Sequence, residues 1–312
     1  MNRRLFLATP TLMSVTGQQV LSGNASIRAK AGPSDIVITT TTRLAGAVDS
    51  LRWNGKEFID SADHGRQLQS ASSFDLGRPG PFWAECYNPT EAGSRRDGAG
   101  EKSTSNLEFI KAAENALLTR STMAFWLNPE EKSSGRPALN TVALSNHRLE
   151  KNVRIGMTGL PHAIDYRVTF NVPSGERHTM GQFEALTGYM PAEFSRFLTW
   201  DPATGNTSPL DDGPGEQRLP LVFTVPGETH AMGIYTPEMP VVPKGSPPFG
   251  KPTYGRFRFQ VEKVVKWNCV FRVRDPSGIS AGDYSLRMFV AVGSLADVRE
   301  TFATLERRHM AK

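Results

Sequence analysis

The chain has 312 residues, a hydrophobic fraction of 38% and a formal net charge of +5, with 28 Gly and 22 Pro. This balance allows a buried core but predicts many turns, so it favours strands joined by loops over long packed helices. After the first 31 residues, no apolar segment has the length needed to cross a bilayer as a helix, so no membrane span is expected.

The first residues resemble a twin-arginine export signal. Residues 2–7 contain two adjacent arginines followed by Phe and Leu, and residues 29–31 have the small-x-small form of a cleavage site. We therefore expect residues 1–31 to be an export signal peptide and residues 32–312 to form one β-sandwich domain, periplasmic or secreted. A disordered basic N-terminus is the alternative.

That leader would account for most of the positive charge. It contains four bases and no acid, so the remaining chain has a net charge near +1. Because no basic face for nucleic acid is left, nucleic acid is not an expected partner.

Strand signals begin directly after the leader. β-branched residues dominate 36–42, and residues 46–53 alternate apolar and polar side chains before Asn54-Gly55, the dipeptide most typical of a tight hairpin. A second strand of this hairpin is expected over 56–60. Further segments of strand composition, several alternating with period two, occur at 124–127, 140–144, 153–157, 163–172, 219–224, 231–235, 256–261, 267–273 and 284–292.

Helix signals are few. Ser294 can cap a helix over 294–305, whose apolar side chains fall on one face, whereas 107–118 is open between a short helix and a strand. The proline-rich segment 237–252 is predicted to be a stiff surface loop. No linker divides the chain, so we expect a single domain.

Polar side chains without periodicity are concentrated in residues 63–93, which indicates a solvated loop or a site. His64 and Arg66 would share one face of a strand, where an imidazole beside a guanidinium fork could bind a carboxylate or sugar hydroxyls. Gln69 would add an amide from the opposite face. The alternative is the polar outer face of a strand.

The second half of this stretch contains two carboxylates, Glu85 and Glu91, on either side of Tyr87 and Asn88. Acid–base chemistry on sugars uses paired carboxyls of different protonation state, so we expect Glu85 to be the principal acid–base residue, with His64 as a second catalytic group. A turn-rich loop with satisfied backbone groups is the alternative.

Other candidates lie further along the chain. His230 stands at the start of a predicted strand, where clefts often form, and is expected to be catalytic. Glu184 is the one charge in an apolar run and needs a partner or a function, a structural salt bridge being the alternative. Cys86 and Cys269 could form a disulfide in an oxidising compartment, but two buried thiols are favoured. No HxH, HExxH or EF-hand spacing is present, so neither a metal nor a cofactor is expected.

Three segments together resemble the galactose mutarotase-like (aldose 1-epimerase-like) family: residues 46–58, Asn146-His147 after a mid-chain strand, and residues 282–286 before the last strand. The resemblance implies an all-β supersandwich of two large, mostly antiparallel sheets, here with a C-terminal helix. It also implies a sugar-binding cleft with a His general acid and a Glu general base. His147 matches that His, whereas Glu262 precedes a strand in a different local context and does not match the Glu.

These observations predict a carbohydrate-active protein, an enzyme acting on a saccharide as an epimerase, lyase or hydrolase by acid–base chemistry in a polar cleft. The alternative is a non-catalytic carbohydrate-binding protein in which aromatic rings stack on sugars. The substrate-binding residues expected besides the catalytic ones are Arg66, Gln69, Tyr87, Asn88, Glu91, His147 and Glu184.

Overall fold

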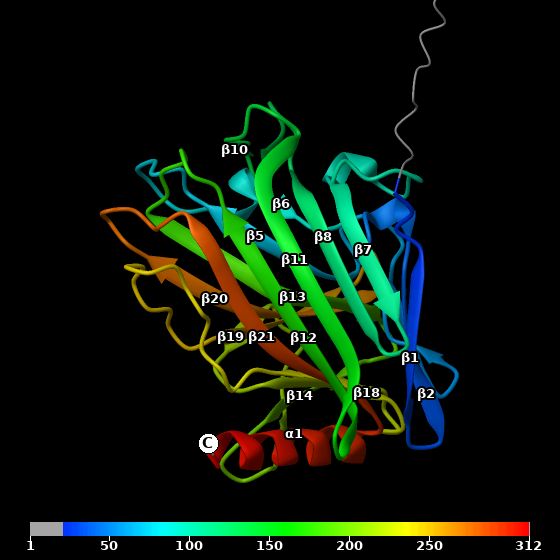
Figure 1. Ribbon diagram of the computed structural model, residues 1–312. Helices are drawn as coiled ribbons and strands as arrows, with labels where there is room; N and C mark the ends of the chain where they lie inside the picture. Colours follow the sequence, from blue (N-terminus) through cyan, green and yellow to red (C-terminus); the bar gives the residue numbers. More distant parts are fainter. Residues whose placement is uncertain (1–20, 312) are drawn as a thin grey trace, which may run out of the picture.

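The structure, a computed structural model, describes residues 21–311 (Figure 1). Most of these residues form antiparallel strands in two layers, which face each other across a common core. The first layer follows the order β1 (Ala25–Ala31), β2 (Ser34–Thr40), β3 (Val48–Trp53), β5 (Leu68–Phe74), β13 (Met180–Pro191), β20 (Val264–Arg274), β19 (Thr253–Phe259) and β16 (Gly215–Gln217), with β4 (Lys56–Glu57) beside β3.

The second layer has a similar extent. It follows the order β7 (Asn106–Ala113), β8 (Ala116–Phe125), β11 (Leu144–Met157), β12 (Leu160–Val172), β21 (Gly282–Gly293), β18 (Ala231–Tyr235), β17 (Leu221–Thr224), β14 (Arg196–Trp200) and β15 (Thr207–Pro209). The sequence left the segment 107–118 undecided between a helix and a strand. In the structure it belongs to the two paired strands β7 and β8.

One short strand joins the two layers. β6 (Pro89–Thr90) pairs with β5 on one side and with β8 on the other, so the layers belong to one hydrogen-bonded network. Around it lie the one-turn helices η1 (Thr42–Leu44), η2 (Ala84–Tyr87) and η3 (Arg95–Asp97) and the separate ribbon of β9 (Lys132–Ser133) and β10 (Arg136–Pro137). The polar stretch 63–93 thus crosses from one layer to the other.

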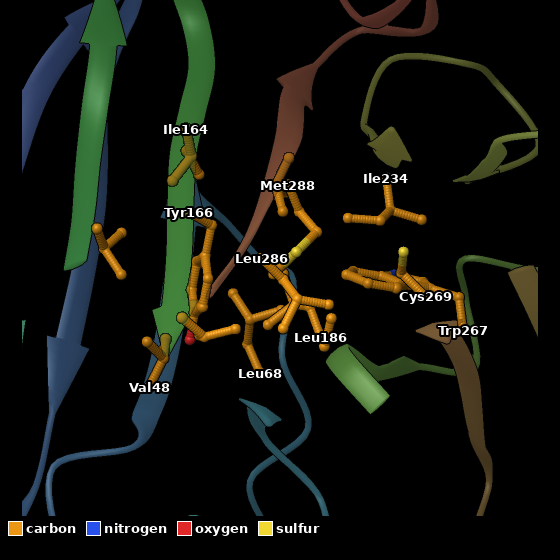
Figure 2. Packing of buried hydrophobic residues seen from close by; sticks show 14 of the residues in the cluster. Val48, Leu68, Ile164, Tyr166, Leu186, Ile234, Trp267, Cys269, Leu286 and Met288 are labelled. Carbon is orange, nitrogen blue, oxygen red and sulfur yellow. The ribbon is translucent and has the colours of Figure 1, made fainter. Parts of the chain in front are cut away.

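The core lies between the layers because the inward positions of the alternating strands are apolar. Figure 2 shows side chains from both layers in contact. The second layer contributes Ile164, Tyr166, Ile234, Leu286 and Met288, and the first contributes Val48, Leu68, Leu186, Trp267 and Cys269. Burying each large apolar side chain stabilises the fold by about 1.5–3 kcal/mol.

The C-terminal helix α1 (Leu295–Met310) covers the outer face of the second layer at one end (Figure 1). Its buried residues are Leu295, Val298, Thr301, Phe302 and Leu305. Ser294 and Asp297 form a reciprocal capping box that satisfies its first turn. The predictions of an all-β fold and of a C-terminal helix are confirmed. The structured residues include no helix long and apolar enough to cross a membrane.

The predicted leader needs a correction at its end. Its arginine motif at 2–7 lies outside the described residues, but Ala25–Ala31 is strand β1, fully paired with β2. Ile27 and Ala31 are buried, and the Ala31 carbonyl accepts a 2.9 Å hydrogen bond from Trp53 Nε1. A cleavage after residue 31 would remove a paired strand of the first layer, so the structure favours keeping residues 25–31 in the folded domain.

We expect a chain of residues 32–312 to be less stable than one of residues 21–312, by at least about 2 kcal/mol. The shorter chain loses the burial of Ile27, which alone contributes about 1.5–3 kcal/mol. Urea denaturation of both chains measures the difference. Equal unfolding free energies would restore the predicted boundary at residue 31. Intact mass of the protein purified after expression of residues 1–312 tests whether a leader is removed.

Candidate functional site

A polar cleft of about 120 Å³ lies on the outer face of the first layer, where β5, β13 and β20 run side by side. Four of the predicted site residues line it: Gln69, Glu85, Asn88 and Glu184. The other lining residues are Gly65, Ala71, Ala84, Thr90, Trp126, Thr187, Tyr189 and Lys266. The cleft therefore combines carboxylates, amides, hydroxyls, one ammonium group and one indole.

A β-bulge in β13 gives the cleft part of its wall. The register with both neighbouring strands shifts after Glu184, because Ala185 is an extra residue with no counterpart in β5 or β20. In a regular strand Glu184 and Thr187 would point to opposite faces. The bulge brings them to the same outer face, where the Thr187 hydroxyl donates to Glu184 Oε2 at 2.9 Å.

Glu184 and Lys266 form the charged centre of the cleft. Lys266 Nζ lies 3.4 Å from Glu184 Oε2 and 5.3 Å from the ring centres of both Tyr189 and Phe257. Burial alone would raise the pKa of Glu184, but the Lys266 ammonium and the Thr187 hydroxyl outweigh it and hold this pKa below its usual range. Burial alone would lower the pKa of Lys266, but Glu184 outweighs it and raises that pKa. Both groups therefore remain charged.

The helix η2 brings the second carboxylate to the cleft. Glu85 is half-buried and accepts a hydrogen bond from the Ser133 hydroxyl of the neighbouring ribbon. Asn88 donates to the Ser72 carbonyl at 2.6 Å and to Ser73 Oγ at 3.0 Å, which fixes its amide against β5. Glu85 is thus held by a neutral hydroxyl, whereas Glu184 is held by a cation.

Trp126 provides a flat apolar wall, and Gly65 makes room for it. A Cβ atom at residue 65 would lie 2.6 Å from Cη2 of the Trp126 ring, closer than any real contact. Gln69 is anchored nearby, since its Oε1 accepts from the Ala92 amide at 3.0 Å and its Nε2 donates to the Gly65 carbonyl at 3.2 Å. In the sequence, Trp126 belongs to the strand-like segment 124–127 and carried no signal of a site.

His64 and Arg66 lie beside the cleft without lining it. His64 is buried, with ring nitrogens 2.7 Å from the Gly98 carbonyl and 2.8 Å from the Arg43 carbonyl, so it ties three loops together. Arg66 forms an ion pair with Asp63 at 3.0 Å.

The expected catalytic residues His64, Glu85 and His230 and the expected binding residue Arg66 therefore do not meet in one cleft, and of the four Glu85 alone lines this one. His230 packs at the other end of the layer, edge-on to Trp53 with ring centres 5.6 Å apart, and contacts the Asn54 carbonyl at 3.3 Å.

Glu91 points into the space between the layers rather than into the cleft. It is 1% exposed and its Oε1 lies 2.5 Å from Nζ of Lys151, which is completely buried. Its Oε2 accepts from the Ser70 amide at 3.0 Å, and Lys151 also donates to the Gly46 carbonyl at 2.8 Å. This position corrects the expectation that Glu91 binds substrate, because no ligand on the surface reaches a buried ion pair.

Tyr87 and His147 belong to a second cluster, next to Glu176 and His178. Burial and the Glu176 carboxylate raise the pKa of the Tyr87 hydroxyl, so it remains a neutral donor. His147 lies on the inner side of β11 and does not line the cleft that contains Glu85 and Glu184.

Both cysteines are buried free thiols, and burial raises the pKa of each. This agrees with the expectation of two buried thiols, which the sequence favoured over a disulfide. Cys86 follows Glu85 in η2, whereas Cys269 lies in the core on β20 (Figure 2).

Comparisons with known proteins found no matching family model and no matching curated protein. Among solved structures, the chain is similar to a "putative aldose 1-epimerase" from Klebsiella pneumoniae, at 9% identity over 91% of each chain and a TM-score of 0.41. It is similar to the Slr1438 protein of Synechocystis, at 11% identity over 91% of this chain and 100% of that one, with a TM-score of 0.42.

A third similar structure is an alpha-galactosidase from Lactobacillus brevis, at 10% identity and a TM-score of 0.43. This match covers 89% of the present chain and 40% of the galactosidase. A description as an aldose 1-epimerase is thus among those of the structures that this chain resembles.

Proposed function

We propose that the cleft on the first layer binds a saccharide and that Glu85 acts on it as an acid–base group. The observation that supports this most directly is the convergence of Glu85 and Glu184 in a cleft that also contains the Trp126 indole. Sugar rings combine an apolar face with a rim of hydroxyls. An aromatic ring complements the first, and carboxylates and amides complement the second.

The two carboxylates are suited to different roles. Glu184 stays ionised beside Lys266, so it is a fixed acceptor for hydroxyls, and Lys266 is a fixed donor for an acidic group or a ring oxygen. Glu85 has a neutral hydroxyl partner at Ser133 and, within residues 21–311, no ion pair, so it is the carboxyl of the two that we assign to acid–base chemistry. A saccharide with acidic or hydroxyl-rich groups fits this arrangement best.

A second candidate is non-catalytic binding of a saccharide in the same cleft. It is favoured by the Glu184–Lys266 pair, because a carboxylate whose charge is compensated at 3.4 Å is a weak base. The export motif at residues 2–7 supports placing either activity in the periplasm or outside the cell.

The test is a screen of the chain from residue 21 against neutral and uronic-acid-containing oligosaccharides. Calorimetry measures binding, while reducing ends, unsaturated products and anomeric equilibration report turnover. Failure of every saccharide to bind at millimolar concentration would rule out both candidates.

We expect Trp126→Ala to weaken saccharide binding by about tenfold or more, since it removes the aromatic wall of the cleft. The control is Phe109→Ala, because Phe109 is a 39% exposed aromatic residue on β7, outside the cleft. Titration calorimetry compares both variants with the unchanged protein. Equal losses, or no loss in Trp126→Ala, would place the saccharide elsewhere.

A further inference from the structure

Three side chains able to bind a metal ion meet at the edge of the core, away from the cleft. His147 comes from β11, and Glu176 and His178 come from the loop between β12 and β13. Nε2 of each histidine lies 2.9 Å from Glu176 Oε2, and the three ligand atoms lie within 4.8 Å of one another. Both histidines are 1% exposed.

The surroundings hold this cluster in place. The Phe74 ring stacks on both imidazoles, with ring centres 4.9 Å from His147 and 4.5 Å from His178. The carboxylate of Asp75 accepts a 2.8 Å hydrogen bond from the Thr179 amide, directly after His178. The loop that contains two of the three ligands is therefore fixed to β5 before any ligand binds.

The two buried imidazoles converge on one oxygen of Glu176, so three atoms able to bind a metal ion face one point. An ion bound there would replace the two hydrogen bonds to Glu176. Nδ1 of His178 is buried with no hydrogen-bond partner among the described residues, and it belongs to the same ring as the Nε2 ligand atom.

We propose that His147, Glu176 and His178 bind a divalent transition-metal ion, with Zn²⁺ as the best fit, through two imidazole nitrogens and one carboxylate oxygen. Ligand atoms bonded to Zn²⁺ at about 2.1 Å in tetrahedral geometry lie about 3.4 Å apart. The present separations, 2.9 Å for each His–Glu pair and at most 4.8 Å overall, lie on either side of that value. Mg²⁺ and Ca²⁺ prefer oxygen ligands and fit this set poorly.

The position of Glu176 gives the ion a route from solvent and an open coordination position. Its side chain is 18% exposed and lines a pocket of about 340 Å³, together with Tyr87, Asn140 and Ser145. Three protein ligands leave the fourth tetrahedral position to water or a small ligand from this pocket. The sequence showed no metal motif because His147 lies 29 residues before Glu176 and only the fold brings the two together.

The test is titration of the chelator-treated, tag-free protein with Zn²⁺, with Mg²⁺ as the comparison ion. We expect one equivalent of Zn²⁺ to bind and to raise Tm by several degrees, with no effect of Mg²⁺. Glu176→Gln keeps the size of the side chain, and we expect it to weaken Zn²⁺ binding by at least about 100-fold. The control is His230→Gln, because His230 lies outside the cluster. We expect this variant to bind Zn²⁺ with the affinity of the unchanged protein.

Substitution with Co²⁺ gives an independent readout, since a tetrahedral nitrogen and oxygen site produces visible absorption bands that Glu176→Gln should lose. Circular dichroism confirms that each variant is folded. The proposal is overturned if the folded, unchanged protein binds no Zn²⁺ at millimolar concentration. Equal Zn²⁺ affinity of Glu176→Gln and the unchanged protein, or equal loss in His230→Gln, would also overturn it.

Discussion

Replacing Lys151 with methionine is expected to lower the free energy of unfolding by about 3–5 kcal/mol. Lys151 Nζ lies 2.5 Å from Glu91 Oε1, and the two side chains are 0% and 1% exposed. Methionine has a similar length but no charge, so it leaves the Glu91 carboxylate buried without its counter-ion. Urea denaturation of both proteins measures this loss.

Two further variants separate charge from packing. Adding Glu91→Gln to the Lys151→Met variant removes the remaining buried charge, so we expect it to recover part of the lost stability. Arg120→Met is the control, because Arg120 pairs with Glu150 across β8 and β11 at 2.9 Å but both are about half exposed, and an exposed pair contributes less than about 1 kcal/mol. If Lys151→Met costs no more than Arg120→Met, the buried pair is not a determinant of stability.

Glu85→Gln is expected to reduce saccharide turnover by roughly 10²–10⁴ while leaving binding and Tm nearly unchanged. Glutamine keeps the shape of the side chain and its hydrogen bond with Ser133 but cannot exchange a proton. The measurement is kcat and KM on a saccharide that the unchanged protein converts, together with calorimetric binding.

Glu150→Gln is the matched control, since Glu150 is a half-exposed carboxylate on the outer face of the second layer. If Glu85→Gln retains full turnover and an unchanged Tm, Glu85 has no acid–base role in the reaction. Binding without turnover in the unchanged protein would instead establish the non-catalytic candidate, for which Glu85→Gln changes affinity alone.

Part of the candidate site could be predicted because it depends on local composition. The density of polar residues in 63–93 drew attention to Gln69, Glu85 and Asn88, which line one cleft in the structure, and the isolated charge of Glu184 indicated a need for a partner, which Lys266 provides. The partner itself, Lys266, lies 82 residues further along the chain and carried no local signal.

Local physical chemistry determined the elements of the fold. The period-two alternation, the Asn54-Gly55 turn with positive φ at both residues, and the Ser294 cap of α1 each depend on residues close together in the sequence. The segment 140–144 shows the limit of such signals. It has strand composition, but the amide of Asn140 donates to the Leu127 and Val142 carbonyls and turns the chain before β11 begins.

Only the tertiary structure decided which polar side chains enter the core. In strand β11, His147 and Lys151 share the face of Leu149, Val153 and Ile155, but this alternation does not reveal which partners pair with the two polar side chains in the core. Their partners, Glu176 and Glu91, are 29 and 60 residues away and come into contact through strand pairing and through β6, which turns from one layer to the other. Pairing between distant segments depends on the packing of the whole chain, which no local pattern of residues encodes.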